Sequence, residues 1–144
     1  MTSALDFIRQ ARTSGDWQGV VDSVPYSQFL GLRVRVESGA LLVEMPFADH
    51  LVGNASLPAL HGGTLGALLE STAIYQALAA IETDALPKTI NISVDYLRSA
   101  GPVTTFAQGL VTKHGRRVIN VRVDAWQDER AKPVAVGNVH FLIS

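Results

Sequence analysis

The chain has no cysteine, only two tryptophans and two methionines, and few charges, with Asp, Glu, Lys and Arg making up 17% of its 144 residues. Without cysteine it forms no disulfide, no thiolate nucleophile and no cysteine-ligated zinc site. A net charge of −1, from 12 basic and 13 acidic residues, argues against a broad nucleic-acid surface. The opening MTSALDFIRQAR has early charges and no long apolar core, unlike a secretory signal. We therefore expect a cytoplasmic protein that binds neither nucleic acid nor membrane.

Apolar residues are plentiful instead, at 47% of the chain, which is high for a soluble protein. The length suits one domain with a buried core. We expect a single domain over residues 1–144, in which residues 1–31 form a helical segment that packs on the rest. The apolar surplus also indicates that a second copy of the chain covers part of the surface.

The stretch 60–81, LHGGTLGALLESTAIYQALAAI, predicts a long helix that is apolar on nearly every side and lies inside the protein. Glu70 is its only Asp, Glu, Lys or Arg. A carboxylate on a buried helix must be paired, neutralised or used. Its helix face carries mostly small residues, which leaves room for a ligand: Gly63, Gly66, Ala67, Ala73, Ile74 and Ala77. From the pattern alone, a solvent-facing or arginine-paired glutamate explains Glu70 as well as a catalytic one does.

Alternating apolar and polar residues predict six strands around this helix. Two precede it, joined by a two-residue turn at Ser38-Gly39, and four follow it with short connections, which favours antiparallel neighbours. The predicted strands are residues 32–37, 41–45, 89–97, 103–113, 118–126 and 134–143. In the third, one face is expected to carry Ile90, Ile92, Val94 and Tyr96, and the other Thr89, Asn91, Ser93 and Asp95.

The remaining segments are short helices and a loop. Residues 4–14 and 25–30 predict helices that Gly15 and Gly31 end, the second with Pro25 in its first position. Residues 47–60 are expected to form a loop, because Gly, Asn, Ser and Pro recur there. The predicted class is α+β: a long central helix wrapped by a curved six-stranded antiparallel sheet, with short N-terminal helices.

His61-Gly62-Gly63 lies at the start of the long helix, where free backbone N–H groups favour anions and polarised carbonyls. Glycine lets a substrate approach this backbone closely. For three residues alone, a plain turn with a capping histidine is the more common explanation. Asn54 offers an amide donor for the same carbonyl, or it is a turn residue.

A small basic cluster is expected at the turn after the fourth strand: Lys113, His114, Arg116 and Arg117. It is either solvated turn charge or a contact for phosphate. Arg98 would join it if the two turns lie at the same end of the sheet. His50 and His140 match no metal-ligand spacing, and the sequence has no Gly-rich nucleotide loop and no G-x-S-x-G element.

Three segments together, GNASLPALHGGTLGALLE, TINISVDYLRSAGP and KHGRRV, resemble the hotdog-fold acyl-CoA thioesterases of the PaaI-like group. The most specific part is HGG followed on the helix by an acid at Glu70. The resemblance covers the chain from Pro25 to the C-terminus. The fold of that group is a long helix wrapped by a curved antiparallel sheet and paired into dimers and often tetramers, which agrees with the architecture predicted above.

This resemblance implies hydrolysis of an acyl-CoA thioester to the free acid and coenzyme A, with no metal and no cofactor besides the coenzyme A of the substrate. Glu70 would be the general base or nucleophile, and the Gly62 N–H would polarise the thioester carbonyl, with His61 and Asn54 helping to set the site. The acid and the carbonyl-binding loop would come from different subunits. A homodimer, alone or within a dimer of dimers, would therefore be required for activity. The residues implied to contact substrate and coenzyme A are Gly63, Thr89, Tyr96, Leu97, Arg98, Ser99, Lys113, His114, Gly115, Arg116 and Arg117.

Two alternatives stay open on the same fold. One is a dehydratase or hydratase acting on 3-hydroxyacyl or enoyl thioesters, with His50 as the base, although that family places its histidine closer to the helix acid. The other is a non-catalytic acyl-CoA-binding protein. The acyl group is not identified by the sequence, and we expect Leu69, Ala73, Tyr75 and residues 47–57 to contact it.

Overall fold

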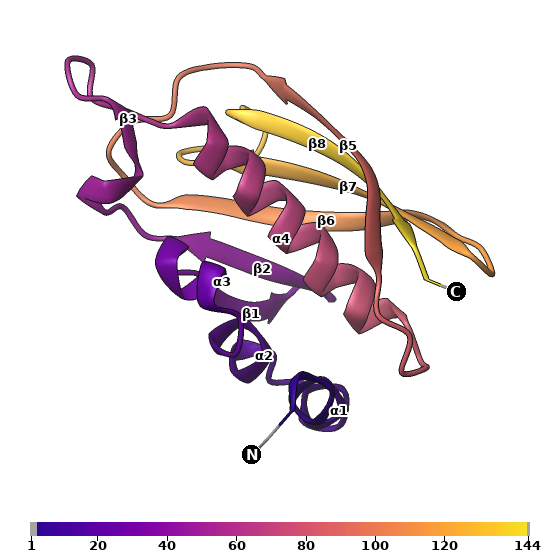
Figure 1. The fold of residues 1–144 in the computed structure, drawn as a ribbon. Helices are drawn as coiled ribbons and strands as arrows, with labels where there is room; N and C mark the ends of the chain where they lie inside the picture. The colour runs from indigo at the N-terminus through magenta and orange to yellow at the C-terminus, as the bar shows by residue number, and fades with distance from the viewer. Residues whose placement is uncertain (1–2, 144) are drawn as a thin grey trace.

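The computed structural model describes residues 3–143, so the first two residues and the last residue of the expected domain lie outside the described residues (Figure 1). Three short helices come first: α1 (Ala4–Ser14), α2 (Gln18–Asp22) and α3 (Pro25–Leu30). Pro25 occupies the first turn of α3, and Gly15 and Gly31 end α1 and α3 in the left-handed conformation. Both expected helix ends are confirmed.

Six strands form one antiparallel sheet in the order β1-β2-β6-β7-β8-β5, which confirms the predicted sheet. The expected turn between the first two strands is also present, with positive φ at Ser38 and Gly39. β5 lies at one edge and pairs with β8 alone within residues 3–143. The strands are β1 (Arg33–Glu37), β2 (Ala40–Met45), β5 (Lys88–Tyr96), β6 (Thr105–His114), β7 (Val118–Trp126) and β8 (Ala135–Leu142).

The long helix α4 (Gly62–Ala80) crosses one face of this sheet, and the N-terminal helices lie beside it (Figure 1). It contacts β2, β5, β6, β7 and β8. Leu68, Leu69 and Ala73 on the helix, and Val123 and Val139 on the sheet, are fully buried in the interface. Each buried leucine of this kind contributes about 1.5–3 kcal/mol relative to an exposed one. The predicted central helix is therefore confirmed.

The segment before α4 differs from the expected loop. It forms a short 3₁₀ turn, η1 (Asp49–Leu51), and a separate two-stranded hairpin, β3 (Val52–Asn54) with β4 (Ala59–Leu60). The His61 N–H donates to the Leu51 carbonyl at 2.8 Å, which holds the hairpin against the start of α4. A Cβ on Gly53 would lie 2.7 Å from the His61 Cα, so glycine is required for this approach. Gly53, which suggested a loop in the sequence, instead allows close packing against the His61 backbone.

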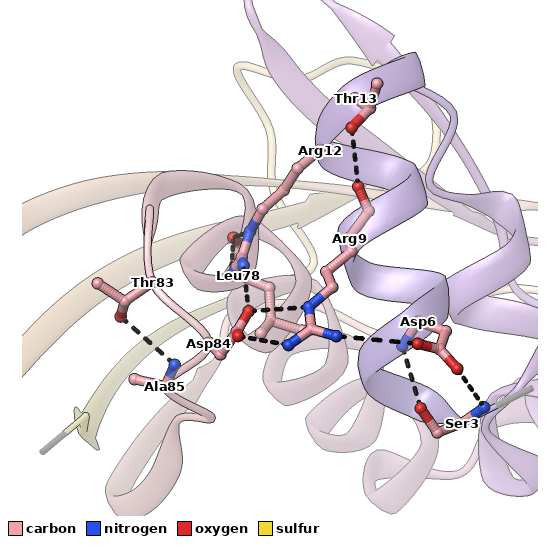
Figure 2. A network of polar contacts seen from close by, with 9 residues as sticks. All are labelled: Ser3, Asp6, Arg9, Arg12, Thr13, Leu78, Thr83, Asp84 and Ala85. Atoms are coloured by element: carbon pink, nitrogen blue, oxygen red, sulfur yellow. Dashed lines mark hydrogen bonds and ion pairs between the residues drawn. The ribbon is translucent and has the colours of Figure 1, made fainter.

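Polar contacts tie α1 to the C-terminal end of α4 (Figure 2). Arg9 Nη2 lies 2.6 Å from Asp84 Oδ2 in the connection between α4 and β5. Arg12 donates to the Leu78 carbonyl at 3.3 Å, one of the carbonyls that the last turn of a helix leaves unpaired. The Arg9 guanidinium, hydrogen-bonded to Asp84, holds the pKa of that carboxyl below its usual value. None of the helices in the described residues is long and apolar enough to cross a membrane.

Candidate active site

Glu70 occupies the middle of α4 and is half-buried rather than enclosed. The Thr89 hydroxyl donates a hydrogen bond of 2.8 Å to Glu70 Oε2. Within residues 3–143 no arginine or lysine forms an ion pair with this carboxylate. Glu70 is therefore not an arginine-paired glutamate of the chain. One of its oxygens is oriented by Thr89, and the other can accept a proton.

A β-bulge places Thr89 on the helix side of the sheet. Thr89 lies opposite Phe141 and Asn91 opposite His140, so Ile90 is an extra residue without a partner in β8. Phe141 is fully buried beneath α4, and Thr89, directly opposite, shares its face. The expected alternation, which put Thr89 on the same face as Asn91, is wrong at this point. A bulge shifts the alternation by one residue and re-aims the side chain.

At the start of α4, His61 is the N-cap residue. Its Nδ1 accepts a hydrogen bond of 2.8 Å from the Gly63 N–H, and its carbonyl accepts one of 2.6 Å from the Thr64 hydroxyl. A Cβ on Gly63 would lie 2.9 Å from His61 Nδ1, so glycine is needed for the cap. The capping histidine is thus present, and the Gly62 N–H at the first helical position has no protein acceptor among the described residues.

Tyr96, the last residue of β5, contacts the same helix start. Its hydroxyl donates a hydrogen bond of 2.8 Å to the Gly62 carbonyl. Beside it lies an open hollow of about 300 Å³, and Arg98 belongs to its wall. The complete lining is Ala59, Leu60, Gly62, Leu65, Tyr96, Leu97, Arg98, Ser99 and Ala100. The structure therefore brings together Gly62 and the segment 96–99, both of which the sequence singled out.

These residues form two separate groups in one chain. Glu70 with Thr89 is one group, and His61 and Gly62 with Tyr96 is the other. Residues 62 and 70 of one helix are separated by about 12 Å along its axis. Thr89 and Tyr96 lie near opposite ends of β5. A single thioester carbonyl cannot reach both groups of one chain.

The basic cluster lies at the β6–β7 turn, next to the end of α4. His114, Gly115 and Arg116 line an open hollow of about 510 Å³ there, together with residues 80–83, Ala85 and Ile143. The strand register puts Lys88 and Val118 at this end of the sheet, and Tyr96 at the other. Arg98, just beyond Tyr96, therefore does not join the cluster. Arg98 would have joined the cluster if the turn after β5 and the β6–β7 turn lay at the same end of the sheet. The length of β5 separates these two turns.

Two further residues named from the sequence are engaged in local contacts. Asn54 Oδ1 accepts a hydrogen bond of 3.0 Å from the Ser56 N–H in the β3–β4 turn. His50 Nε2 lies 2.7 Å from the Phe29 carbonyl. A carbonyl only accepts, so this nitrogen donates. Among the described residues, no group of three or more His, Asp or Glu side chains is arranged to hold a metal ion.

The side chains expected to contact the acyl group are part of the core of the chain. Leu69 and Ala73 are fully buried, and the Tyr75 hydroxyl is 2.5 Å from the Ser27 hydroxyl beneath α3. Burial raises the pKa of this phenol above its usual value. Within the described residues these three side chains pack against the sheet and α3, and their contact with the acyl group stays a prediction. The helix face beside Glu70 instead leaves Ala67 and Ile74 half-exposed.

Comparisons with known proteins agree with this architecture. Residues 57–134 match the family model of the thioesterase superfamily. A solved structure of a protein from Chromobacterium violaceum is 37% identical, covers 95% of this chain and 96% of its own, and has a TM-score of 0.79. A search of curated proteins found no match.

Two solved structures with lower identity share the fold. A phenylacetic acid degradation-related protein from Ralstonia eutropha JMP134 is 23% identical over 95% of this chain and 99% of its own, with a TM-score of 0.78. A Shewanella oneidensis protein related to the thioesterase superfamily is 22% identical over 98% and 97%, with a TM-score of 0.76. The chain belongs to the thioesterase superfamily, which confirms the superfamily that the sequence resemblance indicated, and it shares the fold of the phenylacetic acid degradation-related protein. This membership supports hydrolysis of a thioester.

Proposed function

We propose that the protein hydrolyses an acyl-CoA thioester to the free acid and coenzyme A, with Glu70 as the general base. The observation that carries this proposal is the hydrogen bond from Thr89 to Glu70 Oε2. It orients a half-exposed carboxylate on a helix face of small residues and leaves its second oxygen for a water molecule.

In this mechanism, Glu70 takes a proton from water as the water oxygen attacks the thioester carbonyl carbon. The carbonyl oxygen then carries negative charge, which the Gly62 N–H at the helix start stabilises. Collapse of the tetrahedral intermediate breaks the C–S bond. The proton on Glu70 passes to the departing thiolate of coenzyme A, and the carboxylate is regenerated.

Direct attack by Glu70 is the other route open to a carboxylate at this position. It would form a mixed anhydride and expel coenzyme A, and water would then hydrolyse the anhydride. A single turnover in H₂¹⁸O detects the direct route when water attacks the anhydride at its Glu70 carbonyl. General-base attack puts the label only in the released acid, whereas hydrolysis of the anhydride at its Glu70 carbonyl puts the label in the enzyme.

The separation of the two groups supports a site that a second copy of the chain completes. β5 is an edge strand, and Ile90 and Tyr96 on it are 58% and 55% exposed. Antiparallel pairing of two β5 strands about a twofold axis brings the Tyr96 end of one strand to the Thr89 end of the other. His61 and Gly62 of one subunit then face Glu70 of the partner subunit. We propose a homodimer, alone or within a dimer of dimers, as the active form.

The phosphates of coenzyme A need a cationic surface, and the β6–β7 turn offers one. Lys113, His114, Arg116 and Arg117 are exposed there, at the same end of the sheet as Thr89. Arginine pairs well with phosphate oxygens. In the dimer, Arg98 and Ser99 of the other subunit border the same site, where the pantetheine arm would pass.

The test is thiol release from a panel of aliphatic and aryl acyl-CoAs, with wild type, Glu70→Gln and the control Glu129→Gln, whose carboxylate is exposed on the β7–β8 connection. We expect release by wild type and Glu129→Gln, and its loss in Glu70→Gln. Hydration of crotonyl-CoA without any thiol release would overturn the proposal in favour of a hydratase. Binding of acyl-CoA without turnover in wild type would overturn it in favour of a non-catalytic binder.

A further inference from the structure

Two hydrogen bonds that share one peptide group link Tyr96 to His61. The Tyr96 hydroxyl donates to the Gly62 carbonyl at 2.8 Å. The N–H of the same peptide group, which belongs to Gly63, donates to His61 Nδ1 at 2.8 Å. Tyr96 and His61 come from different elements and are connected through this one peptide.

The direction of both bonds is fixed by chemistry. A carbonyl only accepts, so the Tyr96 hydroxyl is the donor. A backbone N–H only donates, so His61 Nδ1 accepts and the proton of the neutral imidazole lies on Nε2. Hydrogen bonds aligned head to tail polarise one another. A bond from Tyr96 to the peptide carbonyl therefore strengthens the bond from the peptide N–H to the imidazole.

The first turn of α4 depends on such contacts. Gly62 and Gly63 give it weak helix propensity, and it contains no acidic residue. The Tyr96 ring lies against this turn, since a methyl group at Gly62 would be 3.4 Å from it. The hydrogen bond from the Tyr96 hydroxyl is the only one between β5 and this turn among the described residues. Tyr96 thus orients the peptide on which the His61 cap is built.

We propose that Tyr96 is a positioning residue of the thioester site, which acts through the Gly62–Gly63 peptide to fix the tautomer and orientation of His61. His61 then presents its Nε2–H as a second donor beside the Gly62 N–H, where the carbonyl oxygen of the substrate becomes negative. This inference rests on the proposed function. It gives Tyr96 a role in the chemical step, in place of the contact with coenzyme A that the sequence resemblance implies.

The kinetic test compares Tyr96→Phe with Tyr26→Phe, a matched control because Tyr26 is 54% exposed against 55% for Tyr96 and lies on α3. Loss of one hydrogen bond that acts on the transition state lowers kcat about three- to tenfold in Tyr96→Phe, with KM unchanged. Tyr26→Phe is expected to match wild type. A raised KM with unchanged kcat would overturn the inference, since Tyr96 would then hold coenzyme A, and so would unchanged kcat and KM.

A spectroscopic test is independent of activity. At about pH 8.5, where an unperturbed imidazole is neutral, the ¹⁵N shifts of His61 in wild type are expected to indicate protonated Nε2 and accepting Nδ1. In Tyr96→Phe the two shifts should move toward each other, and the Gly63 amide should move as well. An unchanged His61 spectrum in Tyr96→Phe overturns the positioning role. A wild type that shows this shift pattern but hydrolyses no thioester overturns the proposed function and the role of Tyr96 in the chemical step, while the positioning of His61 by Tyr96 stands.

Discussion

Thr89 donates a 2.8 Å hydrogen bond to Glu70, and it faces Glu70 because the bulge at Ile90 turns it toward α4. A regular strand would direct Thr89 away from the helix. Bulges are frequent next to active sites, where they re-aim a side chain. The bulge and the carboxylate thus form one structural unit, and Thr89 orients the group that we propose as the base.

Replacing Thr89 with valine is expected to lower kcat about tenfold or more, because a hydrogen bond to a charged group is lost while the shape is kept. Thr89→Ser retains the hydroxyl and should keep most of the activity. Steady-state kinetics on one acyl-CoA measures both, with thermal unfolding as the check on folding. A Thr89→Val enzyme as active as wild type would contradict the proposed role of Thr89.

Gly63→Ala is expected to abolish the His61 cap, because the new Cβ would lie 2.9 Å from His61 Nδ1. Stability should change by only about 1 kcal/mol, since alanine favours the helix while the lost cap costs a similar amount. Activity should fall much more than stability. Gly19→Ala, where the new Cβ makes an ordinary 3.5 Å contact with Phe7, is the control. Full activity in Gly63→Ala would show that the orientation of His61 does not matter.

The contact between Arg9 and Asp84 predicts a dependence of stability on acid pH. The pKa of Asp84 is lowered in the folded protein by the hydrogen bond from Arg9, so its stabilisation is present above the unfolded pKa and is lost as the pH falls through the folded pKa. The unfolded value is about 3.9. In urea unfolding, the difference between wild type and Asp84→Asn should therefore shrink below about pH 4. A difference that stays constant down to about pH 2.5 would contradict this reasoning.

The basic turn predicts a selective effect on binding. Arg116→Ala combined with Arg117→Ala should raise the KM for an acyl-CoA about three- to tenfold, with kcat unchanged, because exposed ion pairs are individually weak. The KM for the matching S-acyl-pantetheine, which has no phosphates, should not change. Added salt should reduce the difference between the variants and wild type. An equal rise in KM for both substrates would show that the phosphates of coenzyme A do not bind at the β6–β7 turn.

Local signals in the sequence were enough to predict much of the fold. Gly15, Gly31 and the Ser38-Gly39 turn need left-handed or turn conformations that these residues adopt readily, and the structure has them there. The central helix could be predicted because its long apolar stretch is stable only in the interior of a protein.

The parts that could not be predicted depend on pairing between distant residues. The bulge at Ile90 is defined by the register against β8, about fifty residues later in the chain, and alternation within β5 cannot reveal it. The bond from Tyr96 to Gly62 joins a strand to a helix start and has no local signal. Gly53 did carry a signal, although it indicated close approach to His61 and not a loop.

In the proposed dimer, Gly62 of one subunit and Glu70 of the partner subunit act on one thioester. Gly62→Pro removes the N–H at the first helical position, where proline is tolerated, and the extended His61 before it suits a proline. Glu70→Gln removes the base. Each variant alone should be inactive.

The most direct measurement mixes these two inactive variants in equal amounts, allows their subunits to exchange, and follows thiol release. Each mixed dimer then contains one site with both Gly62 and Glu70 intact, so the mixture should recover about one quarter of the wild-type rate. A mixture that stays as inactive as its components after verified exchange would contradict the shared site.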